Sequence, residues 1–201
     1  MSLTPAIRCH PLTNDRWEDF CAVMGKNGGF CGCWCMYWRL PRTEFEGPAR
    51  KSLKARFDTV VKEGPPPGLL AYRGAAPVGW IQVGPRSATP NWNGPRRASA
   101  PVAPGETHDP KSWAISCFVV PKAHRGQGVA TALLKNAIRY AKAQKARALD
   151  ACPVDAAEAA NPASIFHGVA SMFERAGFEE IARRRDNRPL MRLALRQGTD
   201  Y

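Results

Sequence analysis

A glycine-containing segment at residues 123–134 (AHRGQGVATALL) runs from basic residues directly into an apolar stretch. Gly126 and Gly128 flank Gln127, and Arg125 precedes them. The start of a helix leaves peptide N–H groups unpaired and carries a partial positive charge, and glycine lets a ligand approach the backbone closely. These residues therefore predict a phosphate-binding turn at the start of a helix.

Three kinds of phosphate-binding loop fit parts of this segment. A P-loop ATPase would need Lys and then Ser or Thr after Gly128, but Val129 follows, which excludes that class. A dinucleotide-binding turn would need a third glycine where the chain has Thr131, and it comes late in the chain, after a hairpin. That alternative stays open because Asp150 lies at about the right distance for an acid that binds a ribose. The third pattern, Gln/Arg-x-x-Gly-x-Gly/Ala, is matched in full by residues 125–130.

The spacing of apolar residues predicts the elements that position this turn. A continuous apolar run over 113–120 predicts a buried strand just before it. The helix after it has one apolar face, formed by Ala130, Leu133, Leu134, Ala137, Ile138 and Ala141. Other strands are predicted over 6–13, 146–154 and 189–195 and from Phe178, with a hairpin over 68–86. Other helices are predicted over 14–25 and 48–64, and one that ends at Gly177.

These elements predict an α/β (α+β) fold. A strand on either side of one helix implies a parallel pair, whereas the hairpin is antiparallel, so we expect a mixed sheet with helices on its faces. Residues 84–111 hold six prolines and little periodicity, which predicts a long surface loop that could act as a lid.

Length and composition predict one soluble domain. The 201 residues fit a single domain over 1–201, with an N-terminal part at 1–65 and a core at 66–195, and 44% of the residues are hydrophobic. No apolar run has the length of a signal peptide core or a membrane span, so we expect a cytoplasmic protein without a membrane partner.

The net charge of +12 predicts an anionic partner. Residues 121–151 contain seven Lys or Arg against one acid, so the excess concentrates in and just after the glycine segment. Since no nucleic-acid-binding motif accompanies it, we expect a phosphorylated small molecule and no nucleic acid.

The glycine segment resembles the coenzyme A signature of the GNAT superfamily of N-acetyltransferases. Its surroundings strengthen the resemblance: a hairpin at 69–83 (LLAYRGAAPVGWIQV), a strand directly before the turn, and a helix-to-strand junction at 172–184 (MFERAGFEEIARR). The resemblance covers about residues 66 to 195. It implies the GNAT fold: a mostly antiparallel sheet in which one parallel strand pair splays apart.

The resemblance also implies which residues hold acetyl-CoA. Backbone groups of Phe118, Val119 and Val120 would bind the pantetheine, and one N–H of this strand would polarise the thioester carbonyl. The turn would bind the diphosphate through Arg125, Gly126, Gln127, Gly128, Val129, Ala130 and Thr131. No metal is implied.

Acetyl transfer also needs a neutral amine, and the sequence does not identify the group that provides it. An alkylamine with a pKa near ~10.4 is almost fully protonated at pH 7, and Glu106, Asp109 and Asp155 are the candidate bases. Many family members place a tyrosine in the junction helix to protonate the thiolate, but this chain has Phe173 there. Neither a catalytic base nor a catalytic acid is assigned.

Cys31, Cys33 and Cys35 form a second unusual segment. In a strand all three would point to one side. A zinc site needs a fourth ligand and usually a second pair of cysteines, which the segment lacks, so buried thiols among aromatic residues are favoured. The resemblance places this region at the acceptor pocket, where Tyr37 or Trp38 would pack on the acceptor.

Together these observations predict an acetyl-CoA-dependent N-acetyltransferase that acts on a primary amine of a small molecule or peptide by direct attack on the thioester. The alternative is a GNAT-like domain that binds CoA or acyl-CoA as a sensor without transferring the acyl group. A homodimer is left open.

Overall fold

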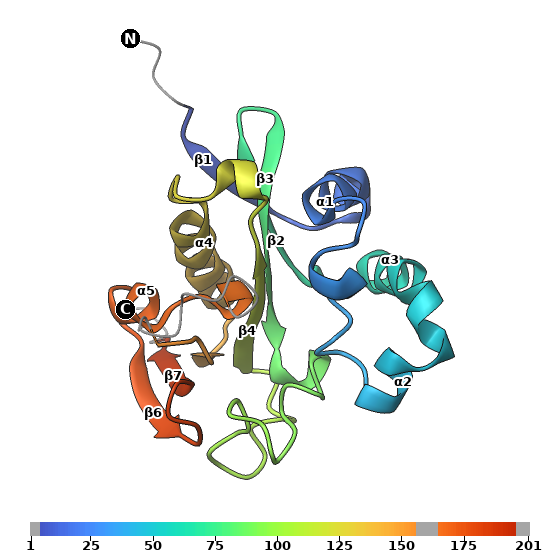
Figure 1. Cartoon of the computed structure of the whole chain (residues 1–201). Coiled ribbons are helices and arrows are strands. Elements are labelled where there is room, and N and C mark those ends of the chain that lie inside the picture. Colours follow the sequence, from blue (N-terminus) through green and yellow to red (C-terminus); the bar gives the residue numbers. More distant parts are fainter. Residues whose placement is uncertain (1–4, 156–164, 196–201) are drawn as a thin grey trace.

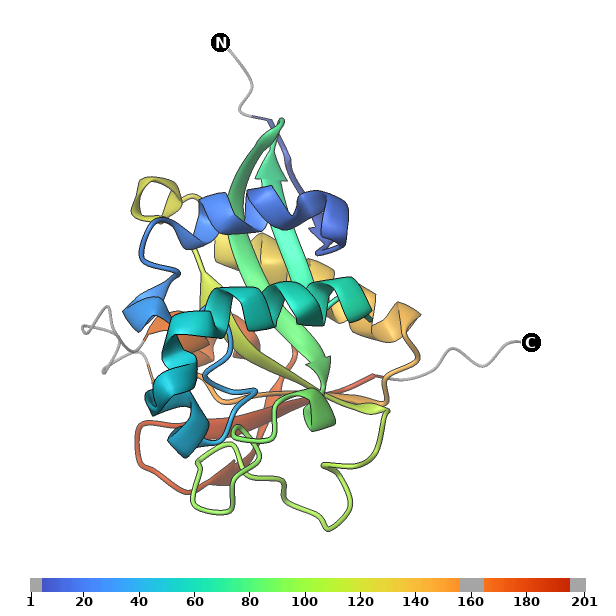
Figure 2. The same cartoon turned by 90° about the vertical axis from the view of Figure 1, so that its right-hand side faces the viewer.

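The computed structural model describes residues 5–155 and 165–195, and a seven-stranded sheet forms its centre (Figures 1 and 2). The strands are β1 (Ile7–Pro11), β2 (Gly68–Arg73), β3 (Ala76–Pro85), β4 (Ser112–Val119), β5 (Ala148–Ala151), β6 (Glu179–Arg183) and β7 (Pro189–Ala194). Their order is β1-β2-β3-β4-β5-β7-β6. Neighbours are antiparallel except β4 and β5, which are parallel. The predicted mixed, mostly antiparallel sheet is confirmed.

Helices cover both faces of the sheet (Figure 1). One face carries α1 (Trp17–Met24), α2 (Arg42–Glu46) and α3 (Leu53–Glu63), and the other carries α4 (Val129–Ala143) and α5 (Ala170–Glu174). Single 3-10 turns link them: η1 (Asn14–Arg16), η2 (Phe30–Gly32), η3 (Pro48–Ser52), η4 (Arg86–Ala88), η5 (Lys122–His124) and η7 (Ile165–His167). None of the helices in the described ranges is long and apolar enough to cross a bilayer.

The apolar face predicted for the helix after the glycine segment packs on the sheet. Leu133, Leu134, Ala137 and Ala141 of α4 are buried there, while Ala130 and Ile138 are partly buried at its edge. Glycine in the middle of β3 permits this contact, because a Cβ at Gly79 would lie 2.6 Å from Val129 Cγ1. The start of α4 is therefore held directly against the sheet.

The opposite face is closed by aromatic packing. Phe20 of α1 lies with its ring centroid 5.0 Å from that of Phe57 of α3 and 5.1 Å from that of Trp80 of β3. All three side chains are fully buried. This cluster fixes the segment between α1 and α2 over the same end of the sheet as the start of α4.

A bulge interrupts β4 at Ser116. Gln82 of β3 pairs with Cys117, but Val83 pairs with Ile115, so Ser116 is the extra residue. The bulge reverses the alternation of side chains: Ile115 and Phe118 both pack in the core beside α4, whereas Cys117 packs in the core beside α1. The Ser116 hydroxyl donates to Gln82 Oε1 at 3.0 Å, which satisfies two buried polar groups.

Two predicted segments differ from the structure. Residues 84–111 are not simply a surface loop, because Trp92 is buried against the guanidinium of Arg86, which lies 4.7 Å from its ring centroid. The helix that ends before Gly177 is also shorter than expected: α5 begins only at Ala170, after Gly168 adopts a positive φ of 78°. Apolar spacing alone did not reveal this break, because it continues through Phe166 and Val169.

Candidate active site

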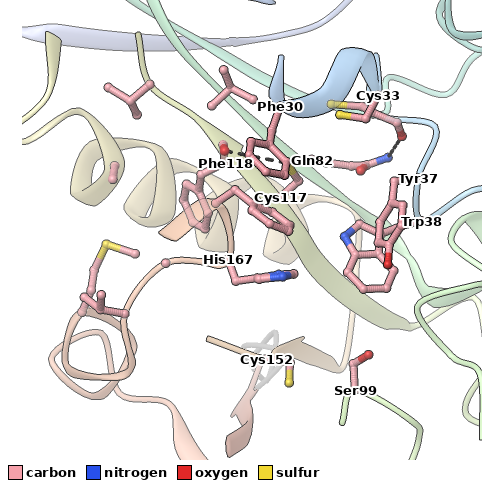
Figure 3. A pocket seen from close by; sticks show the side chains of 18 of the residues that line it. Phe30, Cys33, Tyr37, Trp38, Gln82, Ser99, Cys117, Phe118, Cys152 and His167 are labelled. Carbon is pink, nitrogen blue, oxygen red and sulfur yellow. Dashed lines mark hydrogen bonds between the residues drawn. The ribbon is translucent and has the colours of Figure 1, made fainter. Parts of the chain in front are cut away.

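A large cavity lies against the carboxyl end of β4 (Figure 3). Its volume is about 1100 Å³. The end of β4 and the turn into α4 line one side, and the segments 30–38, 97–99 and 166–172 line the others. The cavity thus joins the predicted phosphate-binding turn to the cysteine-rich segment.

The cavity exists because β4 and β5 separate. The two strands pair only as far as Ile115 and Ala151, after which β4 continues against β3 alone. The chain after β5 turns away, and the N–H of Val154 donates to the carbonyl of Gly168 at 3.0 Å. Since β5 no longer covers this part of β4, the backbone edge of residues 117–120 faces the cavity. The splayed parallel pair implied by the resemblance is confirmed.

The structure brings nine of the ten residues predicted to hold acetyl-CoA to this cavity. They are Phe118, Val119, Val120, Arg125, Gly126, Gly128, Val129, Ala130 and Thr131. The side chain of Gln127 turns away: its Nε2 donates to the Ala123 carbonyl at 2.8 Å and its Oε1 accepts from Arg73 Nη1. Gln127 therefore stabilises the turn from outside the cavity, because its side chain links the Ala123 carbonyl of the turn to Arg73 of β2.

The start of α4 is open to a ligand. Gly128 is the N-cap residue in the left-handed conformation, with φ 78° and ψ 4°, and no side chain caps the helix. The first turn contains no acidic residue, and a Cβ at Gly126 or Gly128 would meet no atom within 4 Å. Arg125 closes the turn by donating from Nε to the Val120 carbonyl at 3.0 Å. Uncapped amides, the helix dipole and nearby positive charge make this turn a site for an anion.

The cysteine-rich segment does not form a strand. Cys31, Trp34 and Cys35 have positive φ values of 54°, 42° and 58°, so the segment winds through turns, and all three cysteines line the cavity. Cys31 is exposed, Cys33 is half-buried, and Cys35 is buried, with its Sγ 3.0 Å from Trp80 Nε1. Within residues 5–155 and 165–195, no group of three His, Cys, Asp or Glu side chains is placed to hold a metal ion. The segment packs as thiols among aromatic rings, as expected.

The buried thiols along the cavity are neutral at physiological pH. Burial, followed by the nearby Cys35, raises the pKa of Cys33 to about 12. A hydrogen bond with Cys35, together with burial, raises the pKa of Cys117 well above its ordinary value. Because the thiolate is the nucleophilic form of cysteine, neither side chain is poised to form an acyl-enzyme.

His167 is the buried ionisable group nearest the middle of the cavity (Figure 3). Burial, followed by the positive charge of Arg188, lowers the pKa of His167 well below its usual range, and a hydrogen bond with the backbone of Ser116 only partly opposes this. The imidazole is therefore neutral at pH 7, and its surroundings disfavour the protonated form. Its ring centroid lies 5.7 Å from that of Trp38 across the cavity.

The three acids considered as bases lie away from this centre, and none of them lines the cavity. Glu106 pairs with Arg192 at 2.7 Å, Asp109 with Arg147 at 2.7 Å, and Asp155 with Arg183 at 2.7 Å. Phe173, at the position of the family's tyrosine, is fully buried, with its ring centroid 6.2 Å from that of Phe118.

Asp150 does not play the part that a dinucleotide site requires. It is 1% exposed and accepts hydrogen bonds from Arg86 Nη1, and from Arg192 Nε at 2.7 Å and Nη2 at 2.9 Å. Both carboxylate oxygens are therefore occupied inside the protein. This removes the sequence feature that kept the dinucleotide-binding alternative open.

Six polar residues of the cavity were not found from the sequence: Arg50, Gln82, Arg97, Ser99, Arg185 and Arg188. Gln82 looks like any polar residue in an alternating strand, and its Nε2 reaches the Cys35 carbonyl at 3.3 Å only because the cysteine-rich segment folds over β3. Arg97 and Arg188 are far apart in the sequence, and both line the cavity only because the fold brings their segments together. No local pattern could have joined them.

The buried neutral His167 predicts a pH-dependent loss of stability. Below pH 6.5 the histidine of the unfolded chain takes up a proton that the folded state excludes, so stability falls as the pH falls, by at most about 1.4 kcal/mol per pH unit. Urea unfolding between pH 5 and 7 measures this slope. The variant His167→Gln should flatten it, whereas the exposed His108→Gln should not. An unchanged slope in the first variant would contradict the buried neutral state.

Comparison with known proteins agrees with this architecture. The sequence model of the acetyltransferase (GNAT) family matches residues 33–178. None of the curated proteins compared with the chain matches it.

Several solved structures share the fold. The protein yncA of Salmonella typhimurium, solved with acetyl-CoA, is 15% identical, with 97% of each chain covered and a TM-score of 0.53. A GNAT-family protein of Desulfovibrio desulfuricans is 16% identical, with 95% of this chain and 100% of that chain covered and a TM-score of 0.53. The PaiA N-acetyltransferase of Thermoplasma acidophilum, in complex with coenzyme A, is 10% identical, with 94% and 99% covered and a TM-score of 0.51.

The family match spans more than half of the chain and includes the splayed strands, the glycine turn and the junction before β6. The chain therefore belongs to the acetyltransferase (GNAT) family and is an acyltransferase.

Proposed function

We propose that this acyltransferase moves an acetyl group from acetyl-CoA to a primary amine of a small-molecule or peptide acceptor. The observation that carries the proposal is a juxtaposition in one cavity: the open backbone edge of residues 117–120 leads directly to the uncapped start of α4 at Gly128. An extended amide-containing arm fits the first feature, and a diphosphate fits the second. Acetyl-CoA carries both groups in this order.

The ten residues 118–120 and 125–131 bind different parts of the cosubstrate. The backbone of Phe118, Val119 and Val120 binds the pantetheine amides, as an added strand would. The amides of residues 127–130, the charge of Arg125 and the Thr131 hydroxyl bind the diphosphate. Gln127 contributes its backbone alone, because its side chain is engaged with Ala123 and Arg73.

The reaction is a direct acyl transfer. The amine nitrogen forms a bond to the thioester carbonyl carbon, the carbon–sulfur bond breaks, and the departing thiolate takes up a proton. A backbone N–H of residues 118–120 stabilises the oxyanion that forms between these steps. Solvent supplies the thiolate's proton, since Phe173 has none to give and is buried in the core.

The amine loses its proton to solvent rather than to a carboxylate side chain. No acid lines the described part of the cavity, and five arginines do: Arg50, Arg97, Arg125, Arg185 and Arg188. Nearby positive charge disfavours an ammonium group and so lowers the pKa of a bound amine. The released proton passes to solvent, because burial and the charge of Arg188 disfavour a protonated His167.

Release of free thiol from acetyl-CoA tests the proposal. A panel of primary amines should support thiol release above the rate without amine, with an acetyl-CoA-free control to subtract the protein's own seven cysteines. Acetyl-CoA should also raise the melting temperature. A shift in melting temperature without thiol release from any amine would instead support the CoA-binding sensor, which the buried Phe173 and the lack of a carboxylate base favour.

The indole of Trp38 is expected to contribute to acceptor binding. It lines the cavity, is 7% exposed, and its Nε1 has no hydrogen-bond partner in the described structure. Trp38→Phe keeps a ring and removes the donor, so the KM for the acceptor should rise about fivefold to tenfold, equivalent to a hydrogen bond worth about 1 kcal/mol. Acetyl-CoA binding should stay unchanged.

Trp113→Phe is the matched control. The indole of Trp113 is also buried and donates to the Pro110 carbonyl at 3.0 Å, but it lies outside the cavity. This variant should lose stability without a change in acceptor KM. Weaker acetyl-CoA binding by Trp38→Phe, with an unchanged acceptor KM, would refute the assignment.

A further inference from the structure

We propose that the acceptor is an amine that also carries a carboxylate, and that Arg97 and Arg188 bind this carboxylate at the side of the cavity away from Phe118. The inference rests on the proposed function, since it concerns the acceptor of that reaction. It begins from the charge of the cavity, in which the described lining contains five arginines and no acid. A polycationic acceptor would be repelled there, whereas an anionic group is attracted.

Arg97 is held in place without a carboxylate. Its guanidinium lies 5.2 Å from the ring centroid of Trp38 and 5.6 Å from that of Tyr37. Its Nη2 donates to Asn91 Oδ1 at 2.8 Å, and its Nη1 donates to Tyr37 Oη at 3.2 Å. The stack and the neutral partners fix the orientation but leave the positive charge uncompensated.

Arg188 is likewise held by a neutral partner and, among the described residues, not by a carboxylate. Its Nη2 donates to the Cys152 carbonyl at 2.7 Å, and its buried Nε has no partner in the described structure. Its charge reaches the centre of the cavity, because it acts on the imidazole of His167. A ligand carboxylate would supply the missing acceptor and charge.

Neither arginine has a carboxylate partner in the described part of the chain. Arg86, Arg183 and Arg192, which lie outside the cavity, each form an ion pair with an Asp or Glu, whereas neither Arg97 nor Arg188 forms one within residues 5–155 and 165–195. Because both also line the cavity, their charges are open to the carboxylate of a ligand.

The unpaired indole N–H of Trp38 completes the subsite. Figure 3 shows Trp38 and Ser99 on one side of the cavity and Phe118 on the other, with His167 between them. An acceptor whose carboxylate meets Arg97, Arg188 and the Trp38 N–H would extend its amine toward His167 and β4. Its carboxylate also compensates the positive cavity, which an alkylamine alone would not do.

Matched acceptors test this inference by thiol release. The panel consists of L-amino acids, the corresponding carboxamides and the corresponding decarboxylated amines. We expect kcat/KM at least about tenfold higher for the acids. Arg97→Ala should raise the KM for the acids about tenfold to a hundredfold, while the KM for the carboxamides and the Kd of acetyl-CoA change less than about twofold. Arg97→Lys should recover part of the loss.

Arg139→Ala is the matched control, because Arg139 is an exposed cation of α4 outside the cavity. It should behave as the unmodified protein, and melting curves confirm that each variant folds. If carboxamides or decarboxylated amines react as well as the acids, the inference is overturned while the proposed function stands. If Arg97→Ala and Arg188→Ala weaken acetyl-CoA binding and leave the acceptor KM unchanged, the two arginines belong to the cosubstrate and the inference fails. If acetyl-CoA binds but no amine of any class reacts, the proposed transfer itself is refuted.

Discussion

Gly128→Asp is expected to abolish acetyl-CoA binding. The variant places a carboxylate where a Cβ meets no protein atom, at the uncapped start of α4. Two unit charges 4 Å apart repel by about 4 kcal/mol at an effective dielectric constant of 20, which corresponds to roughly a thousandfold weaker binding. The unmodified protein should melt about 5 to 10 °C higher at acetyl-CoA concentrations near 100 times the Kd. The variant should show no such shift.

Gly105→Asp controls for the backbone conformation and the added charge. Gly105 also has a positive φ, 85°, and open space at its Cβ, but it lies outside the cavity. Both variants therefore carry the same strain and the same new carboxylate, so only the position differs. A full thermal shift in Gly128→Asp would remove the turn from the account.

Asp150→Asn is expected to lower the free energy of unfolding more than any of the other variants. The carboxylate is buried with Arg86 on one side and Arg192 on the other, and Arg192 also pairs with Glu106 at 2.7 Å. Neutralising Asp150 leaves the fully buried Arg86 without a counter-charge, and breaking a buried pair in this way costs about 3–5 kcal/mol. Urea unfolding at pH 7 measures the loss. Since Arg86 also donates to the Ser99 carbonyl at 2.7 Å, the loop that carries Arg97 should loosen as well.

Glu46→Gln makes the same change of carboxylate to amide in an exposed pair. Glu46 and Arg42 interact at 3.0 Å at the surface of α2, and such pairs contribute at most about 0.5 kcal/mol. A loss in Asp150→Asn no larger than in this control would show that the buried network does not stabilise the fold.

The sequence predicted the features that depend on neighbouring residues. The glycine turn, the strand before it and the apolar face of α4 are continuous in the chain, so spacing alone located them. The splay of β4 from β5 came from the resemblance instead, and the order of the strands was not predicted, because strand pairing joins distant segments.

The features missed from the sequence all depend on contacts between distant residues or on backbone geometry. Asp150 matched the spacing of a ribose-binding acid, but its partners Arg86 and Arg192 come from two other segments and draw it into the interior. Cys31 and Cys35 alternate with Cys33 as in a strand, yet their positive φ values wind the chain into turns. The bulge at Ser116 could not be predicted, because the apolar run over 113–120 does not show where the strand register shifts.

The cavity illustrates the same limit for function. The side of the cavity proposed for the cosubstrate was located because a short motif specifies the backbone of the glycine turn. Its acceptor side combines Trp38, Arg97, His167 and Arg188 from four segments that only the fold assembles. The sequence could therefore indicate an acetyl donor but not the kind of acceptor.

A crystal structure of the protein with acetyl-CoA tests the central claim most directly. The account predicts diphosphate oxygens about 3 Å from backbone nitrogens of residues 127–130, and the pantetheine along the open edge of 118–120. Density for acetyl-CoA elsewhere on the protein, with the turn before α4 free of ligand, would contradict it.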